Sequence, residues 1–223
     1  MRLHPNDLAA ASYRQRVPTR RFLLRKFAFL ATIFSFLLLA SFASAQQADA
    51  MFGGGTLMSS GSASSSSSTL LLPEKGGLYP SVSADVIFHR RVGFNFEIAW
   101  RGKQGIYGGC TGCQPYRPIL WDVNGVFQPK LSKKVGADLM AGIGMQSTRF
   151  YLPYCTNGFT CSNYTSSNHF LVHIGGGLRY YVWNHVFIRP EAHFYNVMNN
   201  TDAFSSSNIV RVGASIGYTI GPD

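Results

Sequence analysis

The segment VGFNFEIAW, from Val92 to Trp100, decides the fold of this chain. Apolar side chains occupy every even-numbered position, and Gly, Asn, Glu and Ala occupy the positions between them. Successive side chains of a β-strand point to opposite faces. The alternation therefore predicts a strand with one apolar face and one polar face.

Segments of this kind recur along the chain, separated by turn residues. We expect strands near 50–59, 78–89, 92–101, 116–128, 135–147, 169–182, 186–197 and 208–220. Most have the roughly 9 to 11 residues that a tilted membrane-spanning strand requires. The connections alternate between short ones (89–91, 129–134 and 183–185) and long ones (60–77, 102–115, 148–168 and 198–207). This layout predicts an eight-stranded antiparallel up-and-down transmembrane β-barrel with both termini in the periplasm.

The first strand carries the weakest signal of the eight. Gly53, Gly54 and Gly55 lower its strand propensity, and the serine run within 61–75 is typical of a flexible loop or linker. Seven strands would leave an unpaired edge, which a bilayer does not tolerate. The even count therefore depends on this segment.

Residues 1–45 have the three parts of a cleaved signal peptide. Arginines and Lys26 precede an apolar stretch from Phe27 to Phe42, and Ala43 to Ala45 form a small-residue cleavage site. The apolar stretch is shorter than the roughly 20 residues of a spanning helix. We expect cleavage near Ala45 and a single mature barrel domain over 46–223.

The formal charge of +10 comes largely from this leader. The leader holds seven basic residues and one acidic residue, so 46–223 keep 13 basic (20 − 7) and nine acidic residues (10 − 1). A net charge of +4 provides no electrostatic footprint for nucleic acid.

The predicted strands have consistent sides. Facing outward we place Ile119, Trp121, Val123 and Phe127; Val135, Ala137, Leu139, Ala141 and Ile143; Phe170, Val172, Ile174 and Leu178; Val186, Ile188, Ala192 and Phe194; Val210, Val212, Ala214 and Ile216. An interior ion network is predicted from the inward Asp85, Glu97, Asp122, Asp138, Arg179, Arg189, Glu191 and Arg211. Since side chains fill an eight-stranded barrel, we expect a polar plug and not a wide pore.

A soluble lipocalin-like barrel in the periplasm is the main structural alternative. Its outer surface would use lysine freely, whereas all lysines beyond the leader fall in predicted loops or turns: Lys75, Lys103, Lys130, Lys133 and Lys134. Aromatic residues also gather near both ends of the strands, as in membrane barrels. The pattern favours enclosure of the polar face.

Four cysteines form two close pairs, Cys110 with Cys113 and Cys155 with Cys161. Loop disulfides are expected in an exported chain. A four-thiolate zinc site is the alternative, although five residues separate Cys155 from Cys161.

These features together resemble the small outer-membrane barrel proteins, the eight-stranded type of the OmpA transmembrane domain and of the OmpX and opacity-protein groups. The resemblance covers 46–223 and rests on the strand pattern. Such chains usually end in an aromatic residue, whereas this one ends in Gly221, Pro222 and Asp223. Either Tyr218 and Ile220 replace that signal or the last strand stops early.

Some barrels of this size are lipid A enzymes that use a His-x-Ser pair facing the lipid, with an acid on the next strand. No His-x-Ser occurs here, and all predicted strand acids point inward. His173 and His193 beside Glu191 suggest a metal site or an acid/base pair, but interior histidines are more often structural. We therefore predict no catalytic residues, no metal and no cofactor.

The expected function is that of an integral outer-membrane protein of a Gram-negative-type bacterium with a structural or surface-interacting role. The expected partners are outer-membrane lipid and lipopolysaccharide, the barrel-insertion machinery, and an extracellular ligand at the long loops. The uncharged loop from Leu152 to Asn168 is rich in Tyr, Asn, Ser and Thr, a composition that suits contact surfaces. A lipid A-modifying enzyme and a narrow passive pore are the alternatives.

Overall fold

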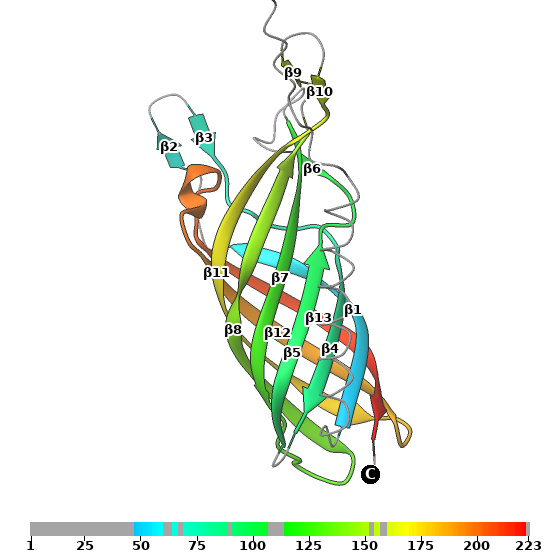
Figure 1. The fold of residues 1–223 in the computed structure, drawn as a ribbon. Helices are drawn as coiled ribbons and strands as arrows, with labels where there is room; N and C mark the ends of the chain where they lie inside the picture. The colour runs from blue at the N-terminus through cyan, green and yellow to red at the C-terminus, as the bar shows by residue number, and fades with distance from the viewer. Residues whose placement is uncertain are drawn as a thin grey trace, which may run out of the picture. The chain divides into compact units, whose positions relative to one another are not determined.

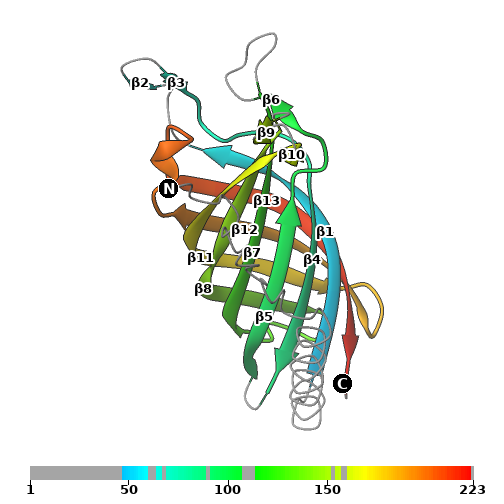
Figure 2. The same ribbon diagram turned by 45° about the horizontal axis from the view of Figure 1, so that its top comes forward.

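The computed structural model describes residues 47–59, 64–66, 69–88, 91–106, 114–151, 154–156 and 160–221. The predicted signal peptide and its cleavage site lie outside these residues. Eight long strands wrap around one axis, as Figures 1 and 2 show. They are β1 (Gln47–Ser59), β4 (Tyr79–Ile87), β5 (Val92–Trp100), β7 (Pro115–Phe127), β8 (Val135–Phe150), β11 (Thr165–Tyr181), β12 (Val186–Val197) and β13 (Asn208–Ile220).

The eight strands form a closed antiparallel barrel, which confirms the predicted fold class. Each strand pairs with the next one along the chain, β13 pairs with β1, and β5 pairs with β7. The two-residue β6 (Gly105–Ile106) adds to the end of β7 beyond β5. Closure leaves none of the eight long strands as an edge.

The first strand is present and begins three residues earlier than predicted. It pairs with β13 from Ala48 to Ser59 and with β4 on its other side. A Cβ atom on Gly53 would lie 2.7 Å from the Ala214 carbonyl oxygen. The glycine run, which lowers strand propensity, thus lets β1 and β13 approach closely.

One predicted loop is shorter than the sequence indicated, and another contains two short strands. Since Phe150 pairs with both Tyr116 and Thr165, β8 and β11 extend into the region predicted as the loop 148–168. Within the segment 61–75 predicted as a loop or linker, β2 (Ser64–Ser66) pairs antiparallel with β3 (Thr69–Leu71). The last strand does not stop early, because β13 reaches Ile220.

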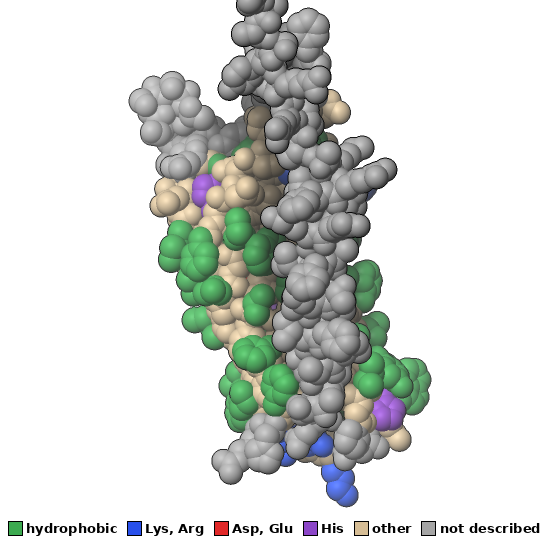
Figure 3. Space-filling view, in the orientation of Figure 1, with side chains coloured by type: hydrophobic (Ala, Val, Ile, Leu, Met, Phe, Trp, Pro, Cys, Tyr) green, Lys and Arg blue, Asp and Glu red, His purple; other side chains and the backbone are tan. Residues whose placement is uncertain are grey.

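The outer wall of the barrel is apolar. Exposed side chains on it include Phe94, Phe96, Trp121, Val123, Leu139, Ile143, Phe170, Ile174, Ile188, Phe194, Val212 and Ile216, and Figure 3 shows such side chains along the visible wall. No lysine lies in the body of the eight strands, whereas three arginines are buried inside. A soluble barrel has charged side chains on its outer surface and apolar side chains inside, so the lipocalin-like alternative is wrong. No helix among the described residues is long and apolar enough to cross a bilayer.

Candidate functional site

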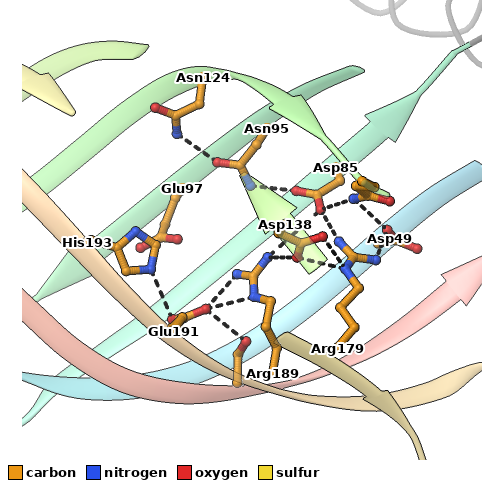
Figure 4. A network of polar contacts seen from close by, with 12 residues as sticks. Asp49, Asp85, Asn95, Glu97, Asn124, Asp138, Arg179, Arg189, Glu191 and His193 are labelled. Carbon is orange, nitrogen blue, oxygen red and sulfur yellow. Dashed lines mark hydrogen bonds and ion pairs between the residues drawn. The ribbon is translucent and has the colours of Figure 1, made fainter. Parts of the chain in front are cut away.

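Arg179 of β11 is the centre of a polar network inside the barrel, near the short turns. Its Nη1 donates to Asp49 of β1 at 2.5 Å, its Nη2 to Asp85 of β4 at 2.5 Å, and its Nε to Asp138 of β8 at 2.7 Å. All four side chains are buried. One guanidinium group, with all its nitrogens engaged, therefore joins four strands (Figure 4).

Arg189 of β12 extends the network toward the middle of the barrel. Its Nη1 lies 3.0 Å from Asp138, and its Nη2 lies 2.7 Å from the Glu191 carboxylate. On the other side of Glu191, Arg211 of β13 donates to Glu97 and lies 3.4 Å from Glu191. Alternating positive and negative groups thus cross the interior without a break.

Two stacked histidines continue from Glu191. The Nδ1 atom of His193 lies 2.9 Å from Nε2 of His173, whose Nδ1 lies 2.6 Å from the Asn124 side-chain oxygen. Since that oxygen only accepts, His173 donates from Nδ1 and accepts from His193. His193 Nε2 then faces Glu191 at 3.5 Å without a hydrogen-bond partner in the described structure. The two histidines thus extend the network from Glu191 to Asn124.

Side-chain amides close the network into a ring. Asn124 donates to Asn95 at 2.8 Å, and Asn95 donates to Asp85 at 2.5 Å. Gln128 also donates to Asp85, at 2.9 Å. From Asp85 the path returns to Arg179. Every one of the eight long strands contributes a side chain to this network.

All eight residues predicted for the interior network are buried inside the barrel. Seven of them form ion pairs with one another, whereas Asp122 contacts Asn124 and lies 3.5 Å from His173. Asp49 was missed because the predicted first strand began at residue 50. Extending the alternation by three residues places Gln47, Asp49 and Met51 on one face and would have found it. The strands thus enclose six carboxyl groups and three arginines.

Glu97, Glu191 and His193 have ligand atoms within 4.8 Å of one another, a spacing that suits a metal ion. However, the Arg211 guanidinium contacts both carboxylates. A metal ion at this point would lie beside a fixed positive charge. The guanidinium already supplies the cation that these carboxylates need.

The interior contains a buried apolar cluster toward the long loops. Seven inward side chains pack there into one buried cluster, which we call the apolar seal: Leu57, Tyr79, Leu120, Leu171, Tyr195, Val197 and Ile209. Polar contacts are therefore only part of the filling at this end, where Glu74, Gln146 and Thr148 are buried as well. Inward positions alternate correctly in the sequence, but the search concentrated on charged residues.

Residues 72–77, in the first long loop, lie over this end of the barrel. The Gly76 amide donates to the Leu57 carbonyl at 2.8 Å, and the Leu72 carbonyl accepts from Ser205 at 3.1 Å. Gly76 and Gly77 have φ angles of 70° and 89°, which favour glycine. This backbone brings Glu74 into a fully buried position.

Glu74 is a buried carboxyl group outside the strands. It accepts a hydrogen bond from Gln146 at 2.6 Å. Burial raises the pKa of Glu74 from 4.5 to about 7, and the Gln146 hydrogen bond and the positive charge of Arg101 offset this only in part. The group therefore changes its charge near neutral pH.

Ser167 and His169 form a pair that the search for His-x-Ser could not find, because the order is reversed. The Ser167 hydroxyl lies 2.7 Å from Nε2 of His169. Among the described residues, no hydrogen bond or ion pair joins His169 to a carboxylate. An acyl-transfer triad needs such an acid to orient the histidine.

The cysteine predictions fall on two different parts of the chain. Cys110 and Cys113 lie outside the described residues. Cys155 of β9 (Tyr154–Thr156) is the register partner of Cys161 of β10 (Thr160–Ser162). This backbone placement suits a disulfide across the hairpin, which stays a prediction.

No known family model and no curated protein sequence matches the chain. Solved structures do match. The chain has the fold of small outer-membrane β-barrels. Ail, the attachment invasion locus protein of Yersinia pestis, matches with a TM-score of 0.50 and 11% identity over 79% of this chain and 99% of that one. Neisserial surface protein A matches with a TM-score of 0.52 and 14% identity over 77% of this chain and 95% of that one. The N-terminal β-barrel domain of Pseudomonas aeruginosa OprF matches with a TM-score of 0.50 and 10% identity over 79% of this chain and 98% of that one. This likeness agrees with the resemblance seen in the strand pattern, and at these identities it concerns the fold alone.

Proposed function

We propose that this protein is an integral outer-membrane barrel with a structural and surface-contacting role, without conduction and without enzymatic turnover. The observation that carries the proposal is the combination of an apolar outer wall with a charged interior that ends in the apolar seal. The wall suits a bilayer. The buried side chains of the seal argue against a water-filled path toward the long loops.

The long loops are the part of the molecule that suits contact with other molecules. Residues 152–168 carry no charge and are rich in polar and aromatic side chains. Two of the proteins that share the fold are named for attachment and invasion and for the bacterial surface. We expect lipopolysaccharide and an extracellular ligand at this end and the insertion machinery during assembly.

Gel mobility of the detergent-folded protein tests the membrane barrel. We expect unheated protein to migrate differently from boiled protein, and its far-ultraviolet circular dichroism to show β-structure. Folded protein in planar bilayers is expected to give no steady openings. Equal mobilities, or openings that survive purification, would contradict the proposal.

The enzyme alternative is tested on Ser167, the one hydroxyl among the described residues that contacts a histidine ring nitrogen. Mass analysis of lipid A is expected to give the same acyl pattern with the wild type, with Ser167→Ala and without the protein. A changed pattern that Ser167→Ala restores would show a lipid-modifying enzyme.

A further inference from the structure

The end of the barrel opposite the apolar seal contains a cavity of about 490 Å³. We call it the periplasmic vestibule. Its inner end is formed by Arg179 and Gln128, and its rim by the turns at 128–134 and 182–185. This volume is typical of small-molecule sites. The proposed outer-membrane function bears only on which compartment the vestibule faces, because the cavity itself is observed.

Positive charge surrounds the vestibule. The exposed side chains of Arg91, Lys130, Lys133 and Lys134 line it, and none of the described residues that line it is acidic. Arg179 beneath them is neutralised by its three carboxylates. None of the four is in an ion pair with a described carboxylate, so they repel one another, and a bound anion relieves that repulsion.

Hydrogen bonds fix the backbone of the turns that carry these cations. The Ser132 hydroxyl accepts from the amides of Lys134 and Val135, and the Lys134 carbonyl accepts from Tyr181 at 2.9 Å. Arg91 has a φ angle of 68°, an uncommon conformation for a residue other than glycine, and its carbonyl accepts from the Gln128 amide. The rim is therefore preorganised.

Apolar side chains form the remaining wall. Ile87, Tyr181, Val182 and Trp183 line the vestibule, and Trp183 is 70% exposed. An exposed indole beside a cluster of cations suits a ligand with an anionic group and an apolar group. Lysine is a common point-charge partner of phosphate, and every phosphate ester, whether a monoester or a diester, carries the negative charge that the rim favours.

We propose that the periplasmic vestibule binds a phosphate ester. The phosphate lies among Lys130, Lys133, Lys134 and Arg91, and the esterified group packs on Trp183 and Val182. Two sources share this chemistry: the headgroup of a phospholipid and a soluble aromatic phosphate. No covalent step is involved.

The experiment uses the detergent-folded barrel in an uncharged maltoside. Trp100→Phe and Trp121→Phe leave Trp183 as the only tryptophan of 46–223, so its fluorescence reports on the site, and calorimetry gives a second readout. The probes are dihexanoylphosphatidylglycerol, phenyl phosphate and inorganic phosphate. We expect saturable binding of at least one ester, more tightly than inorganic phosphate, and weakening by salt. The tighter ester identifies the source.

Replacing Lys130, Lys133 and Lys134 together by Gln is expected to weaken binding at least tenfold. The matched control is Lys75→Gln with Lys103→Gln, which changes lysines of the long loops and should leave binding unchanged. Heat-shifted mobility on gels verifies that each variant is folded. Absence of saturable ester binding, binding that the triple variant retains, or equal affinity for inorganic phosphate would overturn the proposal. Loss of the heat shift in the wild type would instead refute the membrane barrel.

Discussion

The two ends of the barrel interior are filled by different kinds of interaction. Toward the short turns, three arginines and six carboxyl groups form a ring of ion pairs and hydrogen bonds around Arg179. Toward the long loops, the apolar seal packs Leu57, Leu120, Leu171 and their neighbours without charge. Burying ion pairs costs desolvation free energy, whereas burying apolar surface is favourable. The seal therefore provides stability, and the polar network is sensitive to the loss of any partner.

Removing the centre of the polar network should have the largest effect. Arg179→Ala leaves Asp49, Asp85 and Asp138 buried without the cation that pairs with them. We therefore expect the free energy of unfolding to fall by at least about 3 to 5 kcal/mol. Urea unfolding in lipid vesicles, followed by circular dichroism, measures it. The control Lys103→Ala removes an exposed cation and should change little. A small loss for Arg179→Ala would show that the three carboxylates do not depend on this arginine.

Truncation of the seal should cost less. Leu171 is fully buried in the cluster, so Leu171→Ala creates a cavity and should lower the unfolding free energy by about 2 to 5 kcal/mol. Leu178→Ala is the matched control, because Leu178 of the same strand is exposed on the outer wall. The same urea series compares the two. Equal losses would mean that the inner and outer leucines have equivalent surroundings.

The smallest effect concerns the loop that covers the seal. Below pH 4.5 Glu74 is protonated whether the loop is closed or open, and closure is strongest. Between pH 4.5 and about 7 the open loop ionises first, so closure weakens as pH rises, by up to about 3 kcal/mol.

Hydrogen exchange at Gly76, whose amide donates to Leu57, reports this closure. After correction for intrinsic rates, its protection should fall from pH 5 to pH 8. Glu74→Gln has the shape of the protonated side chain but cannot ionise, so it should remove the pH dependence of the protection. A dependence that persists in Glu74→Gln would assign it to another group.

The repeated alternation was sufficient to predict the eight-stranded barrel and the sides of its strands. In β5, Phe94 and Phe96 lie outside and Glu97 lies inside because neighbouring side chains of a strand must face opposite ways. The boundaries were less accurate, since β8 and β11 continue as long as a partner is available. Asp49 was missed for the same reason.

The contacts inside the barrel depend on register between strands far apart in sequence. The sequence indicated that Arg179 faces inward, but its three partners lie on three other strands. Glu74 gave no signal, because a loop has no alternation to mark a buried position. The basic residues of the vestibule were visible as turn lysines, and only the fold placed them around one cavity.

The participation of all eight strands in one polar network has a consequence for assembly. A shift of any strand by one residue turns its inward side chains toward the lipid. A charged side chain such as Arg189 or Arg211 at the middle of a bilayer costs about 2 to 4 kcal/mol. The pairs Arg179–Asp49 and Arg211–Glu97 join strands that are not neighbours, so they form only when the sheet closes on itself. A barrel that closes out of register would therefore lose these pairs and place charged side chains in the lipid.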